Sequence, residues 1–103
     1  MKLLIILSIE EFANDVRKIL SRQKVPIYSE TSVHGFRMDK NQPDITNWFA
    51  SNEQGAYSTL FFSIQDEGCV ERVFEEVKNY NRQSDAGTQN PLHAYSLHVD
   101  GSV

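Results

Sequence analysis

The run Leu3-Leu4-Ile5-Ile6-Leu7 is continuously apolar, as is expected of a central strand that is covered on both faces. It is followed by Ser8-Ile9-Glu10-Glu11, whose serine and glutamate have the spacing of a capping box at the start of a helix. The helix itself is indicated by apolar residues at helical spacing: Phe12, Val16, Ile19 and Leu20. We expect it to end near Gln23 or Lys24, because Pro26 disfavours helix in the residue before it.

The second half of the chain repeats this order. Tyr57–Ile64 alternates as a strong strand, a helix begins near Asp66, and Leu92–Val99 forms the last strand. This second helix carries its core stripe at helical spacing: Val70, Val73, Phe74 and Val77. The weak, half-exposed alternation of Ile27–Arg37 indicates a strand at the sheet edge. The β-α-β-β-α-β order predicts the α+β class, as a ferredoxin-like sandwich with an antiparallel four-stranded sheet and two helices on one face.

A long polar connection, residues 38–55, separates the second strand from the third. Loops of this length inside small domains tend to be functional or disordered, and we expect this one to be mobile in the free protein. Trp48 and Phe49 lie in its middle, outside any strand or helix pattern. Because large aromatic side chains are enriched in interaction hot spots, we assign the pair to docking of a partner. The alternative is that the pair packs over a cleft or onto a neighbouring subunit.

Composition bounds the size and the class of the protein. Residues 1–103 form a single domain, whose apolar content of 40% suffices for one small core. The net charge of −4 argues against nucleic-acid binding, which would need a basic surface. Cys69 is the one cysteine, which excludes a disulfide framework and a multi-cysteine metal site. The sequence shows no apolar stretch long enough to span a membrane and no secretory leader, so we expect a cytoplasmic protein that is not itself a membrane protein.

Three segments resemble the nitrogen-regulatory P-II superfamily, in its divergent P-II-like branch: Val25–Phe36, Phe62–Val77 and Ala94–Val99. They are similar to the family's second strand with the Gly-Phe at the base of its T-loop, to its third strand and second helix, and to its last strand. The resemblance implies a homotrimer that binds nucleotides or other small-molecule effectors in the clefts between subunits. It also implies that the 38–55 connection is T-loop-like and reaches a target enzyme or membrane transporter.

The chain departs from the family in two loops. The 38–55 connection is shorter than a P-II T-loop and lacks its modified tyrosine motif. Residues 82–90 stand where the family has the glycine- and lysine-rich loop that holds the phosphates of ATP. The second departure argues against an ATP site of the family's usual kind. The cofactor is therefore left open between a nucleotide and a divalent metal.

The candidate ligand-binding residues lie at the two loops that the resemblance places together: His34, Gly35, Phe36, Arg37, Arg82, Gly87 and His93. The imidazole of His93 could contact an anion with help from Arg37 and Arg82, and Gly87 could form a backbone nest for phosphate. A divalent metal could instead use one histidine together with an acidic loop residue.

The sequence carries no serine or cysteine nucleophile beside an evident base, so it favours a regulatory protein over an enzyme. Two alternatives stay open. One is a metal-binding or metal-tolerance trimer of the CutA-like type, a sibling family with a tryptophan-containing connection similar to Trp48-Phe49. The other is a small ferredoxin-like enzyme such as a monooxygenase. Association is also expected because Tyr57 and Phe61 share a strand face that the two helices need not cover.

Overall fold

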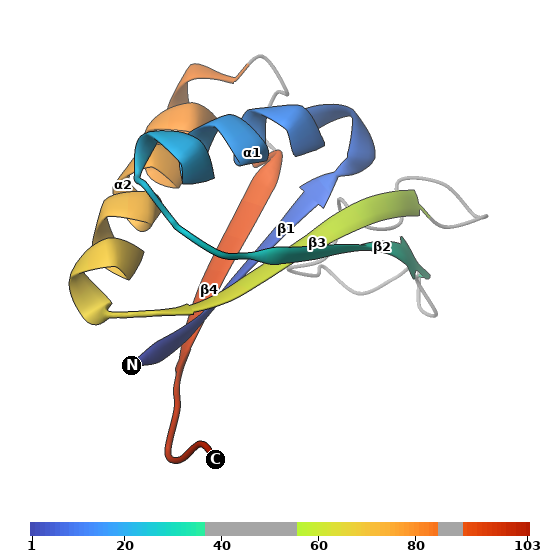
Figure 1. Cartoon of the computed structure of the whole chain (residues 1–103). Helices are drawn as coiled ribbons and strands as arrows, with labels where there is room; N and C mark the ends of the chain where they lie inside the picture. Colours follow the sequence, from blue (N-terminus) through green and yellow to red (C-terminus); the bar gives the residue numbers. More distant parts are fainter. Residues whose placement is uncertain (37–55, 85–89) are drawn as a thin grey trace, which may run out of the picture.

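The computed structural model describes residues 1–36, 56–84 and 90–103. They form one four-stranded sheet and one layer of helices above it (Figure 1). The elements follow in the order β1 (Lys2–Ile9), the 3-10 helix η1 (Glu10–Phe12), α1 (Ala13–Arg22), β2 (Ser29–Gly35), β3 (Ala56–Gln65), α2 (Glu67–Gln83) and β4 (Leu92–His98). The predicted mobility of the 38–55 connection, and the docking role of Trp48 and Phe49, lie outside the described residues.

The sheet has the strand order β2-β3-β1-β4, and each neighbouring pair is antiparallel. β1 lies in the centre, with Ile6 opposite Phe61 of β3 on one side and Ala94 of β4 on the other. β2 and β4 are the two edges. Both helices lie on the same face (Figure 1). The predicted α+β, ferredoxin-like sandwich is confirmed, including the edge position of the second strand.

The core lies between the helices and this covered face of the sheet. Leu4, Ile6 and Phe61 point toward the helices and are at most 1% exposed. The helices contribute the other half of the core through buried residues of α1 (Val16, Ile19, Leu20) and α2 (Val70, Val73, Val77). Because full burial of such a side chain is worth about 1.5–3 kcal/mol, this one layer holds the two βαβ halves together.

The opposite face of the sheet carries no helix and is strongly apolar. Its side chains include Phe62 at 41% exposure, Ile64 at 51% and Leu97 at 50%. The expectation for Tyr57 and Phe61 was therefore wrong in its choice of face. The alternation of β3 is as predicted, but Phe61 points into the core, and the uncovered set is the one that contains Phe62. An apolar sheet face still remains open, but it is formed by the alternate side chains of β3, which point away from the helices.

The two helices begin differently. The predicted capping box at Ser8 is wrong: Ser8 is a buried residue of β1, and its hydroxyl donates to the carbonyl of Ile9 at 2.7 Å. The chain enters α1 through the short η1 turn, without a side-chain cap. α2 begins as predicted, since the carboxylate of Asp66 accepts from the backbone N–H of Cys69 at 2.7 Å. Cys69 itself is a buried core residue.

α1 ends where Pro26 indicates, at Arg22, and the chain leaves it through a Schellman turn. The N–H of Val25 donates to the carbonyl of Leu20, and the N–H of Lys24 to that of Ser21, both at 3.0 Å. Lys24 adopts the left-handed conformation at φ 57°, a position that usually holds glycine because a Cβ crowds the backbone there.

Polar contacts clamp α1 to α2 along their outer side. Glu76 accepts from Arg22 at 2.8 Å and from Gln23 at 2.7 Å. The hydroxyl of Tyr80 donates to the carboxylate of Asp15 at 2.5 Å. Burial, together with the adjacent Asp15 carboxylate, raises the pKa of Tyr80 to about 12, because both disfavour a phenolate at this position.

Replacing Lys24 by glycine is expected to stabilise the protein. A left-handed conformation costs a non-glycine residue about 1 kcal/mol, and the greater freedom of glycine in the unfolded chain cancels part of the gain. We expect Lys24→Gly to raise the free energy of unfolding by about 0.5 kcal/mol in urea titrations. Lys24→Ala is the control, since it removes the same charge but keeps the strain. Equal effects of the two variants would assign the change to charge and would refute the conformational explanation.

The Tyr80–Asp15 contact predicts a specific loss of stability at high pH. The folded pKa of about 12 lies above the unfolded value of about 10. The stabilisation is therefore complete below about pH 10 and is lost as the pH rises toward about 12. Urea titrations at pH 9 and at about pH 11 should show a smaller loss for Tyr80→Phe than for the wild type. An equally steep loss in Tyr80→Phe would contradict the assignment.

Candidate functional site

The first group of candidate residues lies where β2 and β3 end beside the long connection. His34 is paired with Tyr57 across the two strands, and their rings stack at 4.2 Å with an interplanar angle of 11°. The ring centre of Phe36 lies 4.3 Å from that of the imidazole, with the two rings tilted by 46°. Phe36 and Tyr57 are 65% and 61% exposed, so this aromatic stack is a surface feature. Gly35 is the last residue of β2 and pairs with Ala56, whereas Arg37 lies outside the described residues.

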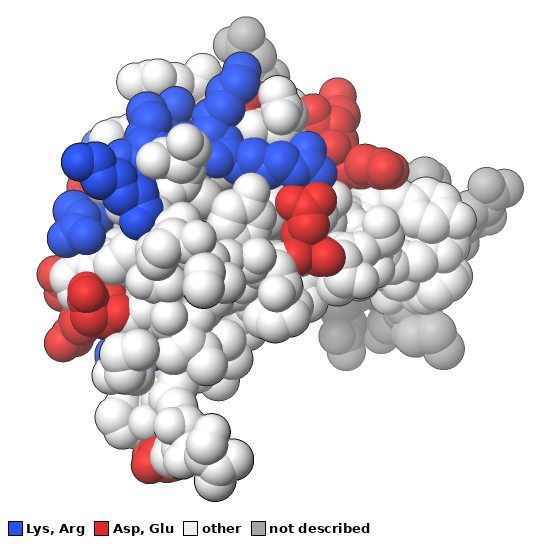
Figure 2. All heavy atoms as spheres, in the orientation of Figure 1, with Lys and Arg blue, Asp and Glu red and all other residues white. Residues whose placement is uncertain are grey.

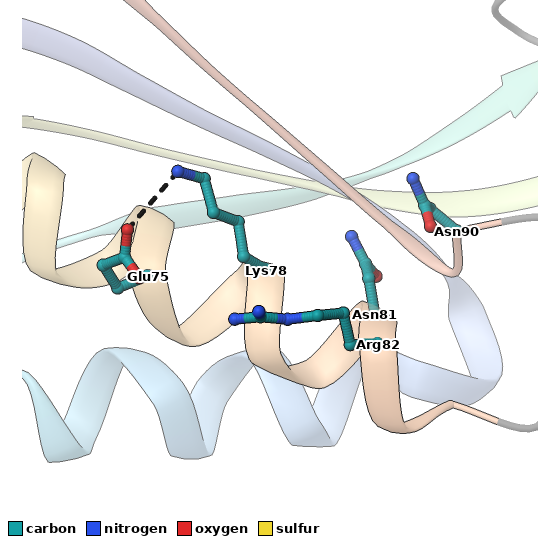
Figure 3. A pocket seen from close by; sticks show the side chains of 5 residues that line it. All are labelled: Glu75, Lys78, Asn81, Arg82 and Asn90. Atoms are coloured by element: carbon teal, nitrogen blue, oxygen red, sulfur yellow. Dashed lines mark hydrogen bonds and ion pairs between the residues drawn. The ribbon is translucent and has the colours of Figure 1, made fainter.

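The second group lies at the carboxyl end of α2, beside the start of β4. Here the structure has a pocket of about 510 Å³, lined by Glu75, Lys78, Asn81, Arg82 and Asn90 (Figure 3). Asn81 fixes the geometry, because its amide donates to the carbonyl of Leu92 at 3.0 Å and accepts from the N–H of Leu92 at 3.1 Å. Gly87, the predicted phosphate nest, lies outside the described residues.

Two cations and one carboxylate line this α2–β4 pocket, which gives it a net positive charge. Lys78 pairs with Glu75 at 3.3 Å, one turn earlier on α2, and both side chains are largely exposed. Arg82 donates to the side-chain carbonyl of Asn79. An exposed pair of this kind contributes little to stability, so Lys78 is readily available to an incoming anion. Among the predicted residues that the structure describes, Arg82 lines this pocket.

The structure does not favour the positively charged imidazole that the sequence analysis considered for His93. It lies on β4 opposite Leu7, on the face of the sheet without helices, and is half-buried. Burial lowers its pKa below the usual value, and a hydrogen bond with the backbone of Asn90 opposes the shift only in part. The imidazole is therefore neutral at pH 7. Among the described residues that line the α2–β4 pocket, the positive charge comes from Arg82 and Lys78.

The two groups of residues lie at opposite edges of the sheet. The aromatic stack is at the β2 edge and the α2–β4 pocket at the β4 edge, with β3 and β1 between them. Three strand spacings separate the edges, which is roughly 14 Å at about 4.8 Å per strand. A single chain therefore does not bring His34 and Phe36 together with Arg82.

The distribution of charge follows the layers of the fold. Figure 2 shows the Lys and Arg side chains gathered over the helix layer, with groups of Asp and Glu beside and below them, while much of the remaining surface over the strands carries neither. No group of three metal-ligating side chains is found within the described residues. None of the described helices is long and apolar enough to cross a membrane.

Three residues of these two groups were not predicted as site residues from the sequence. Tyr57 joins the aromatic stack because it is the cross-strand partner of His34, and that register cannot be read from either strand alone. Lys78 lies four residues before Arg82, so helical spacing could have placed both on the same side of α2. No nearby residue pattern points to Asn81, because its role depends on the start of β4, where the backbone of Leu92 meets its side chain.

No protein-family model matches the chain, and no curated protein matches its sequence. A comparison of folds gives a clear neighbour, a protein of Thermus thermophilus that is described as a putative PII-like signalling protein. The two structures agree with a TM-score of 0.57 over 93% of this chain and 83% of the other, at 16% sequence identity. An agreement at this identity concerns the path of the backbone. The chain therefore has the fold of a PII-like signalling protein, as the three sequence segments suggested.

Proposed function

We propose that the protein is a PII-like regulator, not an enzyme, that binds a small effector between subunits. In this proposal the effector controls a target enzyme or membrane transporter by shifting the population of states of the 38–55 connection. The observation that carries the proposal is the division of the candidate site between opposite edges of one sheet. In this proposal both groups contact the same effector, because the β2 edge of one subunit meets the α2–β4 edge of the next.

The open sheet face supplies a reason for the subunits to meet. Its side chains belong to three neighbouring strands: the half-buried Leu3 and Ile5 of β1, and the exposed Phe62 and Ile64 of β3 and Tyr95 and Leu97 of β4. Large contiguous apolar surfaces on a small domain mark interaction sites. A closed ring of three copies would cover this face and place different edges side by side, since a ring joins unlike surfaces of successive subunits. This supports the homotrimer that the resemblance implies.

The two edges also suggest the chemistry of the effector. Lys78 and Arg82 favour an anionic group, and Arg82 can hold two oxygens at once through its planar guanidinium. The stack of Phe36, His34 and Tyr57 favours a flat ring that extends it. An effector that combines a ring with an anionic group, as a nucleotide does, suits both. No described feature favours the metal-binding or enzymatic alternative.

The proposal predicts complementation between two defective variants, with ADP as the probe. Phe36→Ser removes a ring at the β2 edge, and Arg82→Gln removes the cation at the other edge. Each variant alone should bind ADP at least about ten-fold more weakly in calorimetry, because one half of every cleft is lost. Subunits of the two variants that are unfolded and refolded together should regain wild-type affinity in about one cleft in four, since a shared cleft takes each half from a different chain.

The matched control carries both substitutions in one chain and is refolded alone, which leaves no intact cleft. A mixture of the single variants that binds no better than this control would show that the halves do not share a cleft. Single variants with unchanged affinity for ADP would overturn the assignment of both edges to the effector.

A further inference from the structure

The cations of the chain are concentrated on α1 and on the turn that follows it. Residues 17–24 contain four of the ten lysines and arginines, and residues 16–29 contain no Asp or Glu. Figure 2 shows Lys and Arg side chains gathered over the helix layer, which in Figure 1 includes α1. We call this region the basic α1 surface and define it by Arg17, Lys18, Arg22 and Lys24.

The basic α1 surface has charge available for a partner. Lys18 and Lys24 are exposed, and no ion pair in the part of the chain that the structure describes engages either of them. Arg17 and Arg22 each pair with one glutamate, nitrogen to oxygen at 2.7 Å, and their side chains are 41% and 57% exposed. Four cations and two carboxylates leave a net charge of +2. Because exposed ion pairs contribute little to stability, an incoming carboxylate can share the two guanidinium groups.

Lys24 holds its position at a conformational cost. Its φ of 57° lies in the left-handed region, at the place after a helix where glycine is usual. The turn itself uses only the backbone of Lys24, whose N–H donates to the carbonyl of Ser21, and a glycine would make the same contact. Backbone conformations of this kind are found most often where function requires them. The Lys24 ammonium group therefore points to a use outside the chain.

An exposed apolar side chain lies close to these cations along the chain. Ile27 is three residues after Lys24, between α1 and β2, and is 76% exposed. Its backbone is held in place, because its carbonyl accepts a hydrogen bond from the hydroxyl of Ser63 at 2.5 Å. A single exposed apolar residue is ordinary in itself. Beside the basic α1 surface, it offers a partner an apolar anchor as well as positive charge.

Carboxylates limit the length of an anion that fits this surface. Glu11 and Asp15 precede it along η1 and α1, and Glu30 and Glu76 lie at its sides as the partners of the two arginines. Residues 17–24 extend roughly 12 Å at about 1.5 Å per residue. A nucleic acid or a flat anionic membrane would continue beyond this length and meet the surrounding carboxylates. A short run of acidic residues in a polypeptide would not.

We propose that the basic α1 surface docks a short acidic segment of a partner protein, in which an apolar side chain accompanies the carboxylates. The carboxylates contact Lys18 and Lys24 and share the two guanidinium groups, while the apolar side chain covers Ile27. The helices lie on the opposite side of the sheet from the face that the proposed subunit contact buries, so this surface stays accessible in the assembly (Figure 1). Docking here goes beyond the proposed function, because it requires neither the effector nor the 38–55 connection.

The test uses a fluorescein-labelled peptide of six glutamates around two leucines, and fluorescence anisotropy with the full chain. We expect the peptide to bind, and to bind more weakly as the NaCl concentration rises from about 0.05 M to about 0.5 M. Lys18→Gln and Lys24→Gly should each weaken binding by about three-fold, since each removes one exposed charge contact. Ile27→Ser should weaken it by about ten-fold, because the apolar contact is lost.

Two control variants should bind the peptide as the wild type does. Lys24→Arg keeps the charge at position 24, and Lys2→Gln removes one charge at the start of β1, away from the basic α1 surface. Lys24→Gly separates function from structure, because the relief of the left-handed conformation should stabilise the fold while peptide affinity falls. A purely structural role of Lys24 would change the stability and leave the affinity unchanged.

The proposal is overturned if the peptide does not bind, or if Lys24→Gly and Ile27→Ser bind it as tightly as the wild type. It is also overturned if duplex DNA or vesicles of phosphatidylglycerol bind more tightly than the peptide. A changed sedimentation mass of Lys18→Gln would assign the surface to a contact between subunits instead. None of these measurements involves ADP, so failure of this proposal and failure of the proposed function can be told apart.

Discussion

The antiparallel pairing of β1 with both β3 and β4 is the constraint on which the rest of the structure depends. Side chains alternate along a strand, so this register divides the residues of all four strands into two faces. Two helices can cover one face only. The set with Ile6 and Phe61 becomes the core, and the set with Phe62 and Leu97 is left open. The edge positions of β2 and β4, and with them the separation of the candidate residues, follow from the same pairing.

Two hollows of opposite net charge result from this arrangement. The α2–β4 pocket has Lys78 and Arg82 in its lining, while a hollow beside β2 is lined by Glu10, Glu30 and Arg17. The aromatic stack lies at the β2 edge. Under the proposed function, an anionic effector would contact this stack in one subunit and the α2–β4 pocket in the next.

The sequence predicts the fold well because its signals are local and agree with one another. The alternation of β3, the Asp66 cap of α2 and the stop near Pro26 each follow from a few adjacent residues. It fails where the outcome depends on distant contacts. Whether Phe61 or Phe62 enters the core is decided by the register with β1, and Ser8 is drawn into the strand because it pairs with Thr59 and Leu92. The sequence could not show that the predicted site residues lie at two opposite edges of the sheet, because the strand order depends on contacts between distant residues.

The central claim is that the open sheet face is buried between subunits, and sedimentation equilibrium of the wild type beside Phe62→Asp tests it most directly. A charge at the centre of this face is costly to bury, so the substitution should disrupt association without touching the core. The account predicts a wild-type mass of three times 11.8 kDa, and the monomer mass for Phe62→Asp. Ile27→Asp, which changes an exposed apolar residue outside any strand, should keep the wild-type mass. A monomeric wild type, or a Phe62→Asp variant that associates like the wild type, would contradict the account.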